Sequence, residues 1–289
     1  MRLAAQEQFG QGPPVVLLHG LASTHRWFDL VTEQLAGRRV LRPDHRGHGQ
    51  SSTPPGGYTV ETLATDTADL LTTRGGGPWI VAGHSLGAAV ALRLTAERPD
   101  LVAGLCLIEG GVYDPRVLFG ANWWDAQYTM RLDRRIAPTP AMLAAWARGS
   151  GLPDAAVPAL LANYRPDPAT TDTMDASDMP GTAGGGRVRL RLAANHEIHL
   201  ARSLWCQNPA ALLARVDAPT LAVLARPADR AAFAARRRAL QRTLDRSGRT
   251  IATQWVDGDH DLPLQAADQV AAAVTTLTAM VTDRAGERR

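Results

Sequence analysis

Short apolar runs alternate with stretches of helical periodicity along most of this chain. Each run is bounded by turn-forming residues, which is typical of strands buried in a sheet. The predicted strands are residues 15–18, 39–42, 79–82, 102–108, 220–225 and 251–256. Strands that alternate with helices predict an α/β fold, with a mainly parallel central sheet and helices on both of its faces.

Two helices are well marked by their apolar spacing. Residues 88–97 follow the third predicted strand, and Pro99 ends that helix. The last helix carries apolar residues at helical spacing, at Val270, Val274, Leu277 and Val281.

The alternation breaks between residues 112 and 209. Helical stretches there are residues 123–132, 141–147 and 194–205. A polar segment rich in Asp, Thr, Pro and Gly covers residues 165–187. We interpret residues 112–209 as a mobile helical cap over the carboxyl edge of the sheet, with the polar segment as its loosest part. Residues 1–111 and 210–289 then form the core domain.

Composition narrows the class of protein. The chain has 289 residues, of which 45% are hydrophobic, enough for a substantial core. Its net charge is +3, and every basic residue is arginine. The arginines are scattered except at residues 236–238, which are expected to face solvent on a helix. No basic patch or aromatic platform supports nucleic-acid binding.

The sequence favours a cytoplasmic protein that does not enter membranes. No apolar stretch of the signal-peptide kind follows the first residues, and no apolar run is long enough to span a bilayer. Cys106 and Cys206 are the two cysteines, and a disulfide between them is not expected in that compartment. We expect a monomer or a homodimer.

Residues 83–87 read G-x-S-x-G and lie between a predicted strand and a predicted helix. A serine on such a turn is held clear of the backbone, beside the positive end of a helix. Its hydroxyl is a weak nucleophile at neutral pH and needs a neighbouring base. Ser85 is therefore the candidate nucleophile.

Four motifs in order resemble the α/β-hydrolase superfamily, over nearly the whole chain. They are residues 17–20, 44–51, 83–87 and 258–262. The resemblance implies a serine esterase or lactonase with a helical cap, needing neither cofactor nor metal. Few residues precede the first apolar run, so we expect the antiparallel edge strand that is common in the family to be missing.

The resemblance also assigns roles to residues around Ser85. His260, after the last strand, takes the place of the general base. The backbone N–H groups of Leu21 and Leu86 take the place of the oxyanion hole, which stabilises the negative charge that develops during acyl transfer. His84, at the variable position of the serine motif, is expected to line the pocket.

Two carboxylates compete for the role of orienting the histidine. Relatives usually place this acid after the strand that is fifth here, which points to Asp229. Asp229 lies one residue later than the family pattern, and a role as the N-cap of the following helix also explains it. Glu109 ends an apolar strand, where certain lipases and lactonases carry their acid, and its burial without a partner would be costly. We favour Glu109 and keep Asp229 as the alternative.

Aromatic residues are concentrated in the expected cap and suit a bulky apolar substrate. The candidate contacts are Trp123, Trp124, Tyr128, His196 and Trp205. Adjacent helical residues cannot face the same way, so one of Trp123 and Trp124 should be exposed, or buried where the cap meets the core or another subunit. His196 and His199 lie three residues apart rather than four, which does not match the helical zinc-binding motif.

The leading hypothesis is a serine hydrolase that cleaves an ester, lactone or thioester of a hydrophobic small molecule through an acyl-enzyme on Ser85. One alternative is a carbon–carbon bond hydrolase, or a non-hydrolytic cyclase or lyase of natural-product metabolism. Another is a non-catalytic ligand-binding relative. A fold alone does not choose among them.

Overall fold

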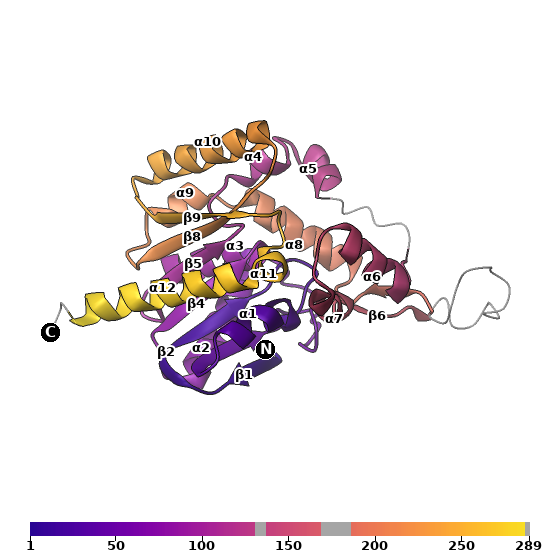
Figure 1. The fold of residues 1–289 in the computed structure, drawn as a ribbon, viewed down its shortest axis with the longest axis horizontal. Coiled ribbons are helices and arrows are strands. Elements are labelled where there is room, and N and C mark those ends of the chain that lie inside the picture. Colours follow the sequence, from indigo (N-terminus) through magenta and orange to yellow (C-terminus); the bar gives the residue numbers. More distant parts are fainter. Residues whose placement is uncertain (131–136, 169–185, 287–289) are drawn as a thin grey trace.

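The strands of this protein form a mainly parallel sheet. The computed structural model describes residues 1–130, 137–168 and 186–286 (Figure 1). Within them, a 7-stranded sheet has the order β1-β3-β2-β4-β5-β8-β9. Its strands are β1 (Ala5–Gln8), β2 (Gln11–Leu18), β3 (Arg38–Pro43), β4 (Trp79–His84), β5 (Val102–Ile108), β8 (Thr220–Arg226) and β9 (Ala252–Asp257). Every neighbouring pair is parallel except β1 with β3, which confirms the predicted fold class.

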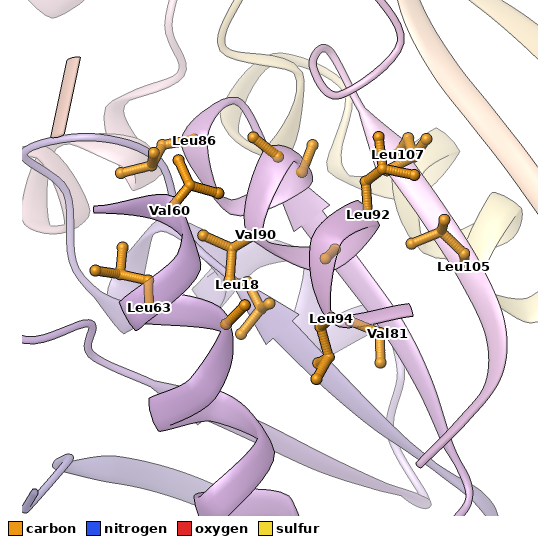
Figure 2. Packing of buried hydrophobic residues seen from close by; sticks show 14 of the residues in the cluster. Leu18, Val60, Leu63, Val81, Leu86, Val90, Leu92, Leu94, Leu105 and Leu107 are labelled. Carbon is orange, nitrogen blue, oxygen red and sulfur yellow. The ribbon is translucent and has the colours of Figure 1, made fainter. Parts of the chain in front are cut away.

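Helices cover both faces of the sheet, so its central strands are buried on both sides. One face carries α2 (Val60–Arg74), α3 (Leu86–Glu97), α9 (Pro209–Leu213) and α10 (Arg230–Ser247). The other carries α1 (Asp29–Gln34), α11 (Leu262–Gln265) and α12 (Ala267–Gly286). Successive residues of β2 alternate between the two cores: Val15 packs on the α12 side and Val16 on the α3 side. Figure 2 shows part of the α3-side core.

The expectation that the edge strand is missing is wrong. β1 pairs antiparallel with β3, with Ala5 opposite Pro43. The few residues before the first apolar run are enough for β1, because β2 begins at Gln11, upstream of its apolar part. The connection from β1 to β2 therefore needs only two residues. The sequence of β1, AQEQ, carries no apolar run because an edge strand is only partly buried.

The chain between β5 and β8 forms mostly short helices. These elements are α4 (Pro115–Phe119), α5 (Trp123–Thr129), α6 (Pro140–Gly149), α7 (Val157–Leu161), β6 (Tyr164–Pro166), β7 (Val188–Leu190) and α8 (Ala194–Cys206). The three predicted helical stretches correspond to α5, α6 and α8, although residues 131 and 132 of the first lie outside the described residues. Most of the polar segment 165–187 also lies outside them. In Figure 1, α6 and α7 lie together on the right of the sheet, and α5 lies above them beside α4. None of the helices in the described ranges is long and apolar enough to cross a membrane.

A buried network joins the loop after β2 to the turn after β3. Asp44 accepts hydrogen bonds from the backbone N–H of His25 (2.7 Å) and of Gln50 (2.9 Å). The backbone N–H of His45 donates to Nε2 of His19 at 3.0 Å, and these two rings lie 4.4 Å apart. The network fixes the loop that leads from β2 toward Ser85.

Three histidines of this region, His19, His45 and His48, are buried, and His48 accepts a hydrogen bond from the backbone N–H of Ala22 at 3.2 Å. Burial lowers the pKa of His45 to about 3 and that of His48 to about 4. The pKa of His19 is also well below its usual value, first because of burial and then because of the neighbouring histidines. Each of these rings takes up a proton more readily in the unfolded chain than in the folded protein.

The fold should therefore lose stability as the pH falls below about 6.5, the ordinary pKa of histidine. Between that value and the folded pKa, the unfolded state binds more protons. A histidine that stays neutral in the folded state lowers the free energy of unfolding by about 2 kcal/mol at pH 5. Urea unfolding from pH 7 to pH 5 measures this. His48→Gln should flatten the pH dependence, and His199→Gln, at an exposed histidine, should not. An unchanged slope in His48→Gln would contradict this account.

Candidate active site

Ser85 lies on a tight turn between β4 and α3. Its φ of 55° and ψ of −116° are unfavourable for a residue other than glycine. A Cβ atom on Gly83 would overlap the carbonyl of Gly87, and one on Gly87 would overlap the carbonyl of Leu18. A Cβ atom on Gly110 would come within 2.6 Å of the carbonyl oxygen of Ser85. The glycines of the motif are required because backbone carbonyl groups of α3 and β2 occupy the space that their side chains would need.

The strained backbone positions lie in the loops that leave the sheet's carboxyl edge. Among the described residues, the non-glycine positions with positive φ are Ala22, Ser85 and Glu109. Ser85 directly follows β4, Glu109 directly follows β5, and Ala22 lies in the loop after β2. Strain of this kind is retained where surrounding structure enforces it, and it is frequent at functional sites.

His260 lies in the loop after β9 and reaches the serine. Its Nε2 atom is 2.9 Å from Oγ of Ser85, so the hydroxyl can donate a hydrogen bond to the ring. The ring of His84 lies beside that of His260, and the two ring centroids are 4.9 Å apart. Nε2 of His84 donates to the backbone carbonyl of His260 at 2.7 Å. This bond fixes the loop that carries the histidine.

Glu109 is a buried carboxylate whose charge acts on His260. The residue is 6% exposed, and its Oε2 atom accepts a hydrogen bond from the backbone N–H of Ala225 at 2.7 Å. Its Oε1 atom pairs with Arg236 of α10. Among the described residues there is no direct hydrogen bond between Glu109 and His260, yet the charge of Glu109 raises the pKa of His260.

Asp229 has a different role in this structure. It is exposed and accepts hydrogen bonds from the backbone N–H groups of Ala231 (2.6 Å) and Ala232 (3.2 Å). These contacts make it the N-cap of α10. Of the two carboxylates considered from the sequence, Glu109 is the one that is buried and whose charge acts on His260.

The pKa of His260 is lowered by its surroundings. Loss of water around the ring is the largest cause, although the residue as a whole is exposed. Glu109 raises this pKa and Arg236 lowers it. The ring is therefore a free base at neutral pH, as proton acceptance from a serine requires. Burial, followed by the charge of Asp259, raises the pKa of the neighbouring Asp261 to about 6.

The predicted backbone donors are Leu86, directly after the serine, and Leu21, in the loop after β2. Leu86 is the first residue of α3, where backbone N–H groups have no partner within the helix. Leu21 follows Gly20, whose Cβ position would be 3.3 Å from Cβ of Ser85. The backbone of this loop therefore passes directly beside the serine.

The two candidate histidines outside the loop of His260 lie in different places. His84 is buried directly before Ser85, and Trp27 stacks on its other side at 6.4 Å. His196, at the start of α8, is buried and stacks on Tyr58 at 3.6 Å. The ring of His196 is therefore engaged in packing against the core domain.

The candidate aromatic residues divide into a packed pair and two exposed side chains. Trp123 contacts Trp205 at 5.9 Å, and Nε1 of Trp205 donates to the carbonyl of Gly120 at 2.9 Å. Trp124 is 81% exposed and Tyr128 is 87% exposed. The expectation that one of the adjacent tryptophans is exposed is confirmed.

The contact of Arg236 with the site was not predicted from the sequence. Residues 236–238 were expected to face solvent, and Arg237 and Arg238 do so, but Arg236 is half-buried against Glu109. The helical spacing contained the signal. Arg236 lies three, four, seven and eleven residues before the buried residues of α10, which are Ala239, Leu240, Thr243 and Ser247.

A hollow of about 340 Å³ lies elsewhere on the molecule. It is lined by residues around the starts of β8 and β9, including Pro219, Ile251 and Arg284. Because parallel strands begin at the edge opposite their carboxyl ends, this hollow lies away from Ser85.

The turn at Ser85 should not tolerate even one added methyl group. In Gly87→Ala, overlap with the Leu18 carbonyl should outweigh the gain in helix propensity, with a net loss of about 1–3 kcal/mol of stability. Gly149→Ala is the matched control, since it also lies in a helix but has open space at its Cβ position. Thermal unfolding of the two variants measures the difference. Equal stability of both would contradict the described turn.

Comparisons with known proteins agree with this arrangement. The family model described as alpha/beta hydrolase fold matches residues 13–179. A 2-(acetamidomethylene)succinate hydrolase of Mesorhizobium japonicum is 37% identical over 101 residues, or 35% of this chain and 36% of that protein. The lipase LipV of Mycobacterium tuberculosis is 36% identical over 110 residues, or 37% of this chain and 41% of that protein. These matches therefore span well under half of either relative.

A solved structure resembles nearly the whole chain. The crystal structure of E-2-(acetamidomethylene)succinate hydrolase superposes with a TM-score of 0.74, covering 95% of this chain and 94% of that one. The two sequences are 23% identical, so the likeness concerns the fold.

Proposed function

Because this chain belongs to the α/β-hydrolase fold family, we propose that it is a serine hydrolase that cleaves an ester, lactone or thioester of a hydrophobic small molecule. The observation that carries the proposal is the 2.9 Å contact between Nε2 of His260 and Oγ of Ser85. A base that is neutral at pH 7 thus lies within hydrogen-bonding distance of a hydroxyl on a strained turn. This arrangement suits nucleophilic catalysis.

In the proposed first step, Oγ of Ser85 attacks the substrate carbonyl carbon while its proton moves to Nε2 of His260. The carbonyl oxygen becomes an oxyanion and accepts hydrogen bonds from the backbone N–H groups of Leu21 and Leu86. The tetrahedral intermediate then collapses and breaks the bond to the leaving oxygen or sulfur, which takes the proton from His260. The acyl group remains on Ser85.

In the second step, water attacks the acyl carbon and gives a proton to His260. Collapse of the second intermediate releases the acid and returns the proton to Ser85. The imidazolium forms in both steps, and the negative charge of Glu109 stabilises it. Glu109 is therefore the proposed acid of the catalytic triad, although its contacts are with Ala225 and Arg236 in this structure.

The proposal extends to residues 112–209 as a cap over the site. Trp123 and Trp205 pack together within this segment, and Trp124 and Tyr128 expose large aromatic surfaces. Exposed aromatic area in the proposed cap supports an apolar substrate. The similar proteins are named as a lipase and as a hydrolase of 2-(acetamidomethylene)succinate, so substrate class differs widely among them.

A fluorophosphonate probe tests the proposed nucleophile. Wild-type protein should be labelled at Ser85, as located by mass spectrometry of its peptides, because a phosphonyl group traps an activated serine. Ser85→Ala should abolish labelling, and His260→Ala should slow it by 1,000-fold or more, on the order seen when a triad base is removed. Circular dichroism should show that both variants fold. A folded wild-type protein that leaves Ser85 unlabelled would overturn the proposal.

Matched isosteric variants test the acid. Glu109→Gln should lower kcat on a chromogenic p-nitrophenyl ester by roughly 100- to 10,000-fold, because the imidazolium loses its counter-charge. Asp229→Asn should stay within about two-fold of wild type, since asparagine caps a helix as well as aspartate. A crippled Asp229→Asn variant beside a near-normal Glu109→Gln variant would reverse the assignment.

A further inference from the structure

Arg236 is the one member of the arginine triplet that points toward the site. Arg238 is exposed, and Arg237 lies over the ring of Phe233 at 5.9 Å. The side chain of Arg236 is 26% exposed, and its Nη1 atom pairs with Oε1 of Glu109. The three residues share charge and helix, so they differ chiefly in this contact.

The position of the Glu109 carboxylate depends on two other elements. Oε2 is held by the backbone N–H of Ala225 in β8, and Oε1 by Arg236 in α10. The backbone N–H of Glu109 donates to the carbonyl of Val223 at 2.9 Å. Its φ of 43° is unfavourable, so the local chain does not by itself prefer this conformation. A carboxylate whose side chain is only 4% exposed also needs a cation or several donors to remain charged.

We propose that Arg236 is a positioning residue of the active site, which fixes the Glu109 carboxylate behind His260 and balances its negative charge. The proposal rests on the function proposed above. Arg236 touches neither the substrate nor the reacting atoms in that mechanism, and acts on His260 through Glu109 and through its own charge.

Other charged or titratable groups also surround His260. They are His84 on β4, Ser85 after it, Glu109 after β5, Arg236 on α10, and Asp257, Asp259 and Asp261 on its own loop. Asp257 is neutralised by an ion pair with Arg226. Burial holds the pKa of His84 at about 3, so His84 is neutral in the working range. Asp261, with a pKa of about 6, titrates in the same range as a histidine and must be controlled for.

The sign of the effect follows from the charges. Glu109 raises the pKa of His260 and Arg236 lowers it, while burial is the largest cause of its lowered value. Removing the cation leaves the carboxylate unbalanced, so the pKa of His260 rises. His260 then becomes a free base only at a higher pH, and the acid limb of the activity profile moves upward.

The test compares Arg236→Met and Arg236→Lys with Arg238→Met, which removes the same charge from an exposed position of the same helix. The readouts are the pH dependence of the rate of fluorophosphonate labelling at Ser85, and kcat and KM on a p-nitrophenyl ester. Arg236→Met should move the acid-limb midpoint up by about one pH unit and lower kcat at least about ten-fold, with KM little changed. Arg236→Lys should recover most of both effects, and Arg238→Met should match wild type.

The same variants are also made in a protein that carries Asp261→Asn, so that Asp261 no longer titrates in the range of His260. The upward shift of the acid-limb midpoint in Arg236→Met should persist in this background. An Arg236→Met profile that is unchanged or moves to lower pH would overturn the proposal. So would an equal shift in Arg238→Met, because the effect would then be one of general charge. Failure of the proposed function gives a different result, because Ser85 of the wild-type protein would then remain unlabelled.

Arg236→Met leaves a buried carboxylate without its cation, so the variant can fail to fold. The double variant Glu109→Gln with Arg236→Met removes both charges and keeps the proposal testable. The charge of Arg236 acts directly only on the pKa of His260, so kcat is compared above the acid limb, where His260 is a free base. If Arg236 otherwise acts through Glu109, kcat of the double variant should there equal that of Glu109→Gln alone. A further ten-fold loss in the double variant would show that Arg236 has a separate role and would overturn the proposal.

Discussion

The backbone conformation of Ser85 is the constraint on which the site depends. A positive φ at a serine costs on the order of 1–3 kcal/mol, and the fold must supply this from packing around the turn. Carbonyl groups of β2 and of α3 fill the space that side chains at Gly83 and Gly87 would occupy. The turn therefore forms only when β2, β4 and α3 are in register, which makes the position of the hydroxyl a property of the whole sheet.

The groups that face Ser85 are positioned by elements far apart in the sequence. His260 comes from the loop after β9, and its backbone carbonyl is tied to His84 at the end of β4. Glu109 comes from the end of β5 and is held by β8 and α10. Burial keeps the network histidines neutral and lowers the pKa of His260, so one physical effect serves both the fold and the proposed base. Under the proposed mechanism, the sheet edge gathers these groups without needing a metal or an organic cofactor.

Much of the fold was predictable because its strands are buried on both faces and read as apolar runs. The edge strand β1 was missed because its polar sequence resembles a loop, and only its pairing with β3 defines it. Local motifs at strand ends singled out Ser85 and His260, which the structure brings within 2.9 Å of each other. The partners of Glu109 could not be found this way, since Ala225 contributes only a backbone N–H and Arg236 looks like its two exposed neighbours. Such contacts depend on how α10 lies against the sheet, which single-sequence periodicity indicates only weakly.

Trapping the acyl-enzyme tests the central claim most directly. Rapid acid quench of the wild-type protein with an excess of a p-nitrophenyl ester, followed by intact-mass and peptide mass spectrometry, measures covalent occupancy during turnover. The account predicts one acyl group per chain, located at Ser85, that forms with the first release of p-nitrophenol and disappears as the substrate is exhausted. Turnover with no covalent adduct, or with the adduct on another residue, would contradict it.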